Sequence, residues 1–285
     1  MPDRVVVVGD INTDIVVHSP VPLADTAVGT DTASRIALSG GGSAANTAVW
    51  LAYAGVPVTL VGAVGQDAEG AARLAELGAA GVRCAVARVT GNTGAIVVLS
   101  DPGERTMLCD RGANQLLPVS YVDGAIRAAG AAHLHLSAYP LFDADSRPAA
   151  RAALATAREL GMTISVDAAS AGPLAENPDF ATWVRGVDLL LANADEAEVL
   201  GDAVRDIAGT LVTKRGRAGA SLANADGVVE VPAIPAEVVD PTGAGDAFAA
   251  GFLSAWLSGT DRRTALVAAT EYGARAVTAL GARPR

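Results

Sequence analysis

Short runs of β-branched residues alternate with alanine-rich segments along most of this chain. A strand at 5–8 is followed by a helix at 43–54, which we expect Ser43 to cap, and by a strand at 58–61. Because parallel strands are joined by helices that cross the sheet, this order predicts a three-layer α/β/α fold with a mostly parallel central sheet. Further expected helices are 67–77, 121–129, 145–160, 194–200, 244–257 and 262–280, and further strands are 133–136, 163–166, 189–191, 211–213, 221–223 and 228–231.

Three segments depart from this alternation. Polar and apolar residues alternate at about 11–18 and 33–38, and two strand-like runs within 92–110 flank the turn sequence D-P-G. We expect these segments to join into a small β-sheet beside the main one. No linker demands a boundary, so residues 1–285 are expected to form one domain.

The charge balance excludes several classes of function. Acidic residues outnumber basic ones by 31 to 21, and Lys214 is the single lysine. Without a basic cluster, neither a nucleic acid nor an anionic membrane surface is an expected partner. The loop GxxxxGK[ST] of Walker-type NTPases is absent, because an arginine follows Lys214. Two cysteines and three histidines cannot build a cysteine-rich zinc site.

No segment has the pattern of a targeting signal or a membrane span. The apolar run 5–8 is too short for a signal peptide, and the longest later run, 247–257, falls short of the roughly 20 residues that a span needs. The low cysteine content fits a reducing compartment. We therefore expect a cytoplasmic protein.

Three glycine-rich turns are candidate ligand sites. The first (G-G-G-S-A-A-N) precedes a helix, and its Gly40, Gly42 and Ala45 match the dinucleotide fingerprint GxGxxG/A, with Asp67 as the following acid. That fingerprint should follow the first strand, however, and this one does not. Two other interpretations are a tight turn with a helix cap, and glycine amides that line a hydroxyl-rich ligand together with Asn46.

The second turn (D-P-T-G-A-G-D) opens the helix at 244–257. Its two glycines, Gly243 and Gly245, let several N–H groups point at one place, and the helix dipole would complete an anion hole. In the first helical turn, Asp246 could simply complement the dipole. We favour a functional role, because phosphoryl transfer to an alcohol needs a base beside donors for the developing charge.

The third turn (K-R-G-R-A-G, 214–219) follows an expected strand and carries three cations. It is either a solvated basic turn or a contact to a nucleotide phosphate that needs no Walker loop.

With these turns placed, the chain resembles the ribokinase-like sugar kinases, also called the PfkB carbohydrate kinase family, from about residue 5 to residue 282. The resemblance implies a ribokinase-like fold with a small β-sheet lid. Five motifs occur in the family's order: paired glycines before an asparagine (41–46), G-x-V-G-x-D-x-x-G (62–70), the lid stretch G-E-R-T (103–106), N-x-x-E (193–196) and a sequence similar to D-T-x-G-A-G-D (240–246).

The resemblance also implies the groups that carry out the reaction. Asp246 would be the general base, and the amides of Gly243, Ala244 and Gly245 would stabilise the transferring phosphoryl group. Residues that would organise ATP and Mg²⁺ are Asn193 and Glu196, through water, and Lys214, Gly216, Gly219 and Thr242 on the nucleotide side. Many members have threonine at the position of Lys214.

Substrate and cation ligands follow from the same motifs. The acid that accepts bonds from sugar hydroxyls corresponds to Asp14, and the other implied substrate ligands are Asn12, Gly41, Gly42, Asn46 and Arg105. Carboxylate and amide pairs suit vicinal diols, because each can satisfy two hydroxyls. Many members bind a monovalent cation, often K⁺, at the positions of Asp240 and Thr242.

Two departures bear on the substrate. Ribokinase itself has a lysine where this chain has Ser43, and a glutamate at the strand end that here carries His133 and His135. Ribose is therefore not the default substrate. The two histidines alternate along one strand and share a face, and we interpret them as packed or hydrogen-bonded rather than as substrate ligands.

The main hypothesis is ATP-dependent phosphorylation of a primary hydroxyl on a sugar or sugar-like compound. A nucleoside kinase would share all five motifs, while a dinucleotide-dependent oxidoreductase and a non-catalytic sugar sensor belong to other classes. The lid should cover the sugar and exclude water that would otherwise accept the phosphoryl group. An exposed face of the lid would suit a homodimer.

Overall fold

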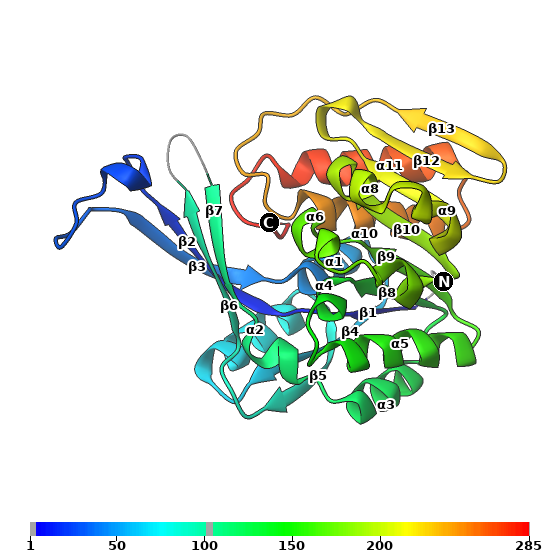
Figure 1. Ribbon diagram of the computed structural model, residues 1–285, viewed down its shortest axis with the longest axis horizontal. Coiled ribbons are helices and arrows are strands. Elements are labelled where there is room, and N and C mark those ends of the chain that lie inside the picture. The colour runs from blue at the N-terminus through cyan, green and yellow to red at the C-terminus, as the bar shows by residue number, and fades with distance from the viewer. Residues whose placement is uncertain (1–3, 101–104, 285) are drawn as a thin grey trace.

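The computed structural model describes residues 4–100 and 105–284, apart from the side chains of Arg105 and Arg205. Within them a nine-stranded sheet forms the centre (Figure 1). Its strands run parallel from β11 to β5, and β12 and β13 are antiparallel. The order is β13 (Gly227–Val231), β12 (Ala220–Asn224), β11 (Ala208–Lys214), β10 (Val187–Asn193), β9 (Thr163–Asp167), β8 (His133–Ser137), β1 (Val5–Val8), β4 (Val58–Gly65) and β5 (Arg83–Val89).

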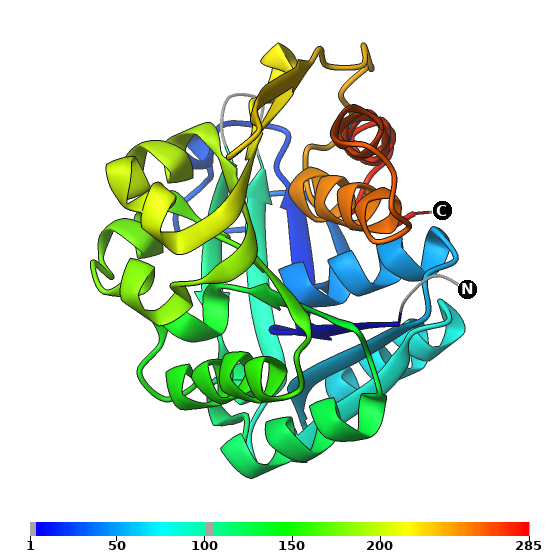
Figure 2. The ribbon, with the colours of Figure 1, turned by 90° about the vertical axis from the view of Figure 1, so that its right-hand side faces the viewer.

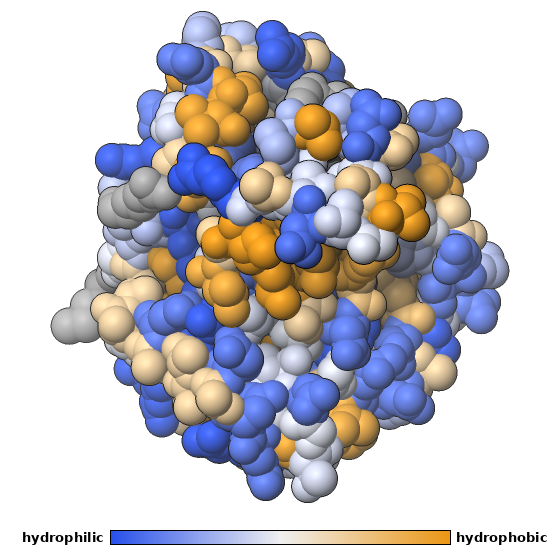
Figure 3. Space-filling view, turned by 90° about the vertical axis from the view of Figure 1, so that its left-hand side faces the viewer, coloured by the Kyte–Doolittle hydropathy of each residue, from blue (hydrophilic) through white to orange (hydrophobic). Residues whose placement is uncertain are grey.

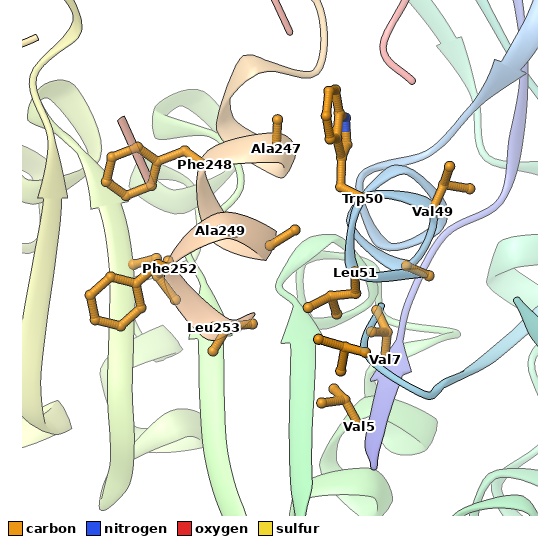
Figure 4. Packing of buried hydrophobic residues seen from close by; sticks show 14 of the residues in the cluster. Val5, Val7, Val49, Trp50, Leu51, Ala247, Phe248, Ala249, Phe252 and Leu253 are labelled. Carbon is orange, nitrogen blue, oxygen red and sulfur yellow. The ribbon is translucent and has the colours of Figure 1, made fainter. Parts of the chain in front are cut away.

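Alternation along β1 separates the core into two layers, because successive side chains of a strand point to opposite faces of the sheet. Val5 and Val7 belong to one buried cluster and Val6 and Val8 to the other. Figure 4 shows the first layer, where Leu51 lies next to Val7. The helices of this layer are α1 (Ser43–Tyr53), α2 (Ala68–Ala79), α10 (Ala244–Trp256) and α11 (Arg262–Ala276).

The opposite face is covered by a second set of helices, so that the sheet lies between two helical layers (Figure 2). They are α3 (Val119–Ala129), α4 (Tyr139–Phe142), α5 (Arg147–Glu159), α6 (Ala171–Ala175), α7 (Phe180–Val184), α8 (Ala194–Leu200) and α9 (Val204–Ile207). Short 3₁₀ helices are η1 (Leu23–Asp25), η2 (Gly112–Leu116), η3 (Gly201–Ala203) and η4 (Gly216–Ala218). This arrangement confirms the three-layer α/β fold.

A separate small sheet projects from the body (Figure 1). Its order is β3 (Arg35–Gly41), β2 (Asn12–His18), β6 (Gly94–Ser100) and β7 (Arg105–Asp110). Two of its pairings are antiparallel, while β2 and β6 run parallel. These strands come from the three segments expected to join into a small second sheet, and the presence of that sheet is confirmed, while its role as a lid stays a prediction. The expected D-P-G turn at 101–103 and the motif residues 103–104 lie outside the described residues.

Three local predictions were wrong. Gly42, not Ser43, is the N-cap of α1, because the Ser43 hydroxyl is bonded to another helix. The last helix ends at Ala276 rather than at 280. The carbonyl of Val277 accepts the amides of Val239 and Asp240, and the chain turns away there.

The third error is the omission of β5. This strand lies at the edge of the sheet, where partly exposed and charged residues replace a continuous apolar run. Its sequence therefore lacks the apolar signal of the central strands. No helix within the described residues has the length and apolarity to cross a membrane.

Candidate active site

Asp246 lies in the first turn of α10 and faces the start of α1. The Ser43 hydroxyl donates to its Oδ1 at 2.8 Å, and the Asn46 amide donates to its Oδ2 at 3.0 Å. Burial raises the pKa of Asp246 to about 7, against the effect of these two hydrogen bonds, which favour the charged form. Its carboxylate is therefore held in one orientation and can change protonation state near neutral pH.

The turn before α10 presents backbone amides beside Asp246. Gly243 has a φ of +73°, and a Cβ there would lie 2.6 Å from Ala282, so the position needs glycine. The amide of Ala244 donates to the Pro241 carbonyl at 3.3 Å. The amides of Gly243, Gly245 and Asp246 have no acceptor among the described residues. Three donors thus remain for an anion, at a helix end whose dipole favours negative charge.

Lys214 ends β11 and extends toward this turn. Its Nζ donates to Asp167 Oδ2 at 2.7 Å, and it lies 3.4 Å from where a Cβ of Gly245 would be. Both side chains are largely buried. Burial opposes the charge of Lys214, but Asp167 and Glu196 outweigh it, so the pKa of Lys214 is raised and the ammonium stays charged.

A groove of about 520 Å³ runs from Lys214 between η4 and the helices α10 and α11. Gly216 and Gly219 lie on one wall, and Phe248 and Val277 are among the apolar residues on the other. Gly219 has a φ of +87°, and a Cβ there would meet the Val231 carbonyl at 2.0 Å. The groove has the size and apolar lining typical of small-molecule sites.

Asn193 and Glu196 are bonded to each other at the start of α8. The Asn193 side chain accepts the Glu196 amide at 2.8 Å, and Glu196 accepts both the Asn193 amide and its side-chain NH₂ at 2.7 Å. This capping box fixes both side chains. Burial raises the pKa of Glu196.

The Asp240 side chain links the turn at 240–243 to the segment after α11 by hydrogen bonds. Its Oδ1 accepts the amide and the hydroxyl of Thr242, and its Oδ2 accepts the Gly281 amide at 2.9 Å. The two residues expected at a monovalent cation site are therefore in contact with each other.

On the lid side of Asp246, the glycine run at 40–42 leaves room for other groups. A Cβ on Gly41 would lie 2.0 Å from Asp14, and one on Gly42 would lie 2.4 Å from the Asp10 carbonyl. Gly40 and Gly41 belong to strand β3 of the lid, and α1 begins after Gly42, which excludes a dinucleotide turn after the first strand.

Asp10 and Asn12 form a buried support below these residues. Asp10 accepts the backbone amides of Ser43 and Ala44. The Asn12 side chain donates through Nδ2 to Asp10 at 3.1 Å, and its Oδ1 accepts from Asn114 Nδ2 at 2.8 Å. Asn12 is fully buried, and both ends of its side-chain amide are bonded to protein groups.

Beside Asp10 lies a small hollow, which Arg111 and Tyr139 line together with Asp10 and Asn114. The Arg111 guanidinium lies 4.4 Å from the centre of the Tyr139 ring. It has no hydrogen bond or ion pair among the residues described by the structure. Burial and the charge of Asp10 raise the pKa of Tyr139.

His133 and His135 are buried away from this hollow. His133 bonds Thr163 at 2.8 Å and Ser165 at 2.7 Å, and His135 bonds the same Ser165 at 2.8 Å. Burial lowers the pKa of His133 to about 3 and that of His135 to about 4, so both are neutral. Their interpretation as hydrogen-bonded residues of the core is confirmed.

Several residues of this region were not predicted from the sequence: Asp10, Ser43, Arg111, Asn114, Tyr139, Asp167 and Arg283. Asp10 and Asp167 carried a usable signal, because each stands at the carboxyl end of a buried strand. The side chain of Arg105, expected to bind substrate, lies outside the described part of the chain.

The three-layer fold, the small sheet and the glycine turns at this edge of the main sheet match a class of kinases that phosphorylate sugar-like substrates. The chain belongs to the pfkB family of carbohydrate kinases, whose model matches residues 2–285. It is 33% identical over 291 residues to an ATP-dependent ribose-1-phosphate kinase of Halopiger xanaduensis. The match covers 98% of this chain and 94% of that protein.

Two further comparisons agree with this family. A nucleoside kinase of Methanothermobacter thermautotrophicus is 29% identical over 272 residues, covering 90% of this chain and 84% of that protein. A candidate ribokinase II of E. coli, solved in complex with ATP and Mg²⁺, has a TM-score of 0.86 at 23% identity, covering 99% of this chain and 94% of that one. The latter similarity supports the fold.

Proposed function

We propose that the protein transfers the γ-phosphoryl group of ATP to a primary hydroxyl of its substrate, with Asp246 as the general base. The observation that carries this proposal is the Asp246 carboxylate, fixed by Ser43 and Asn46 beside the amides of Gly243 and Gly245. The hydroxyl proton passes to Asp246, the substrate oxygen bonds to the γ-phosphorus, and the bond to the β-phosphate oxygen breaks to release ADP.

The nucleotide would occupy the groove beside Lys214. Its apolar wall suits a purine base, and Gly216 and Gly219 let the backbone approach the ligand closely. Lys214 then lies at the end where the phosphates meet the anion hole. A single buried lysine, the helix dipole and free amides can together balance phosphate charge without a basic surface.

Mg²⁺ would be held by Glu196 and Asn193 through water. Carboxylate and amide oxygens suit this ion, which usually keeps several of its waters. When bound, it neutralises charge on the phosphates. A monovalent cation at Asp240 and Thr242 is a separate proposal, which follows from the family resemblance. The Asp240 carboxylate already accepts hydrogen bonds from Thr242 and Gly281. Measuring turnover with and without K⁺ tests whether the cation is required.

The substrate is proposed to be a pentose with a substituent on its anomeric carbon. The two relatives described above act on ribose 1-phosphate and on nucleosides, and both compounds fit this description. Arg111 favours the phosphate, because its guanidinium is a partly buried cation without a carboxylate partner among the described residues.

A homodimer through the lid is a further proposal. Ile36 and Leu38 on β3 and Leu108 on β7 are each more than half exposed and share one face of the small sheet. Figure 3 shows hydrophobic residues gathered on the side of the molecule from which the lid projects. A second copy of the chain would cover them. Light scattering at micromolar concentration tests this proposal, and a monomer would contradict it.

The kinase proposal is tested by an ADP-release assay over ribose 1-phosphate, ribose and nucleosides. Asp246→Asn should lower kcat by orders of magnitude with an unchanged circular dichroism spectrum. Turnover near that of the wild type in this variant would overturn the role of Asp246. Thermal stabilisation by NAD and not by ATP would overturn the reaction class.

A further inference from the structure

Arg283 reaches the site from the segment that follows α11. Two hydrogen bonds hold this segment in place: Trp50 Nε1 donates to the Ala282 carbonyl at 2.9 Å, and the Gly281 amide donates to Asp240 at 2.9 Å. Trp50 is itself fully buried in the core beside α10 (Figure 4). The position of the Arg283 backbone is thus tied to α1 and to the turn that precedes α10.

The Arg283 guanidinium bonds three groups around the glycine run. Nε donates to Asn46 Oδ1 at 3.1 Å, Nη2 donates to the Gly41 carbonyl at 3.2 Å, and Nη1 lies 3.4 Å from Glu76 Oε2. A Cβ on Gly40 would lie 2.0 Å from Nη1, so glycine there makes room for this side chain. The side chain is 16% exposed.

Glu76 holds the outer side of Arg283. It accepts Arg73 Nη2 at 2.8 Å through its other oxygen, and Arg73 is buried on the adjacent helix turn. The bonds therefore run from Arg73 through Glu76 and Arg283 to Asn46, and from Asn46 to Asp246.

The orientation of the Asn46 amide is the consequence of this arrangement. An asparagine side chain presents an acceptor at one end and a donor at the other, and a rotation of 180° exchanges them. With Arg283 donating to Oδ1, only the NH₂ end can face the Asp246 carboxylate. Without Arg283, the amide can turn and place its oxygen against the carboxylate, which would repel it.

We propose that Arg283 is a positioning residue that fixes the Asn46 amide so that it donates to the general base. This inference rests on the proposed function of Asp246. The Arg283 guanidinium does not bond the Asp246 carboxylate, because its donors are directed to Asn46, Gly41 and Glu76. The expected loss on its removal is roughly ten- to hundredfold in kcat, the scale of a small displacement of a catalytic group.

Other charged groups also act on Asp246 and have to be kept constant in the test. Asp167 at the end of β9 raises its pKa, and Lys214 at the end of β11 lowers it. Asp14 of β2 lies near Arg283 on the lid side. None of these groups is changed by a substitution at Arg283.

The test compares Arg283→Met with Arg262→Met, whose guanidinium also donates to an asparagine oxygen, that of Asn224 at 2.9 Å, on the outer hairpin. Arg283→Met should lower kcat at least tenfold, change the acceptor KM less than twofold and shift the acid limb of kcat/KM to higher pH, because the bond from Asn46 to the charged carboxylate is lost. The control should behave as the wild type. A rise in KM at unchanged kcat would instead make Arg283 a substrate ligand and overturn the proposal.

A double-mutant cycle separates positioning from a general structural effect. In the Asn46→Ala background, Arg283→Met should cause no further loss of kcat, because no amide remains to be oriented. A further loss as large as in the wild-type background would overturn the proposal. If Arg283→Met fails to fold, Arg283→Lys takes its place, since one ammonium cannot serve three acceptors arranged around a guanidinium.

A measurement without turnover distinguishes this proposal from the kinase proposal. In ligand-free protein, the side-chain NH₂ protons of Asn46, assigned by NMR with Asn46→Ala, should exchange with water faster in Arg283→Met than in the wild type. Unchanged exchange would overturn the positioning role whether or not the enzyme is active. An inactive wild-type protein with the expected exchange would overturn only the function.

Discussion

Lys214, the single lysine of the chain, forms a largely buried ion pair with Asp167, with its Nζ 2.7 Å from Oδ2. The two residues end strands β11 and β9, on either side of β10. Their pairing places one fixed cation beside Gly245, in the turn that we propose to be the anion hole. The single lysine of the sequence therefore lies at the site, where its charge is balanced by Asp167.

Asp167→Asn should destabilise the protein, because removal of one partner leaves a buried charge uncompensated. We expect a loss of about 3 kcal/mol in the free energy of unfolding, measured by urea denaturation. Lys214→Met combined with Asp167→Leu should restore much of this stability but not the activity. An equally unstable double variant would contradict the account of the pair.

The rate should depend on pH through Asp246, whose pKa is raised to about 7. Because the proposed general base accepts the proton in its charged form, kcat/KM should rise with pH through about 7 and be lost progressively below it. Ser43→Ala removes a hydrogen bond that favours the charged form, so its acid limb should move to higher pH. A profile in Ser43→Ala that moves to lower pH would contradict this assignment.

Gly243→Ala should impair both stability and turnover. The substitution forces a side chain into a left-handed conformation and against Ala282 at 2.6 Å. Gly259→Ala is the matched control, since its φ is +81° and no described atom lies within 4 Å of the new Cβ. The control should lose about 1 kcal/mol by thermal denaturation and keep its kcat. If both variants lost the same stability and kcat, the close approach to Ala282 would not explain the effect of Gly243→Ala.

Arg111→Gln tests the proposed anomeric phosphate. Loss of the Arg111 guanidinium should raise KM for ribose 1-phosphate about tenfold or more, because one charge-assisted contact to the phosphate is removed. The KM for an uncharged nucleoside or for ribose should change little. The same fold-change for charged and uncharged acceptors, measured by ADP release, would show that Arg111 acts only through its contact with Tyr139.

The α/β fold, the strands of the small sheet and the turn that carries Asp246 could all be predicted from the amino-acid sequence. These features depend on local patterns: the apolar period, glycines before helices and the D-P-G sequence within 92–110. Strand β5 and the end of α11 escaped prediction, because an edge strand has a weak apolar signal and the helix end depends on contacts with Val239 and Asp240.

The residues that surround Asp246 could be identified only in the folded chain. Ser43 and Asn46 come from a helix some 200 residues earlier, Lys214 is held by Asp167, and Arg283 arrives from the segment after the last helix. No sequence spacing encodes these contacts, because they arise where strand ends and helix starts converge at one edge of the sheet. The glycine run at 40–42 is the clearest case. Its sequence alone allowed a dinucleotide turn, whereas in the fold it makes room for Asp10, Asp14 and Arg283.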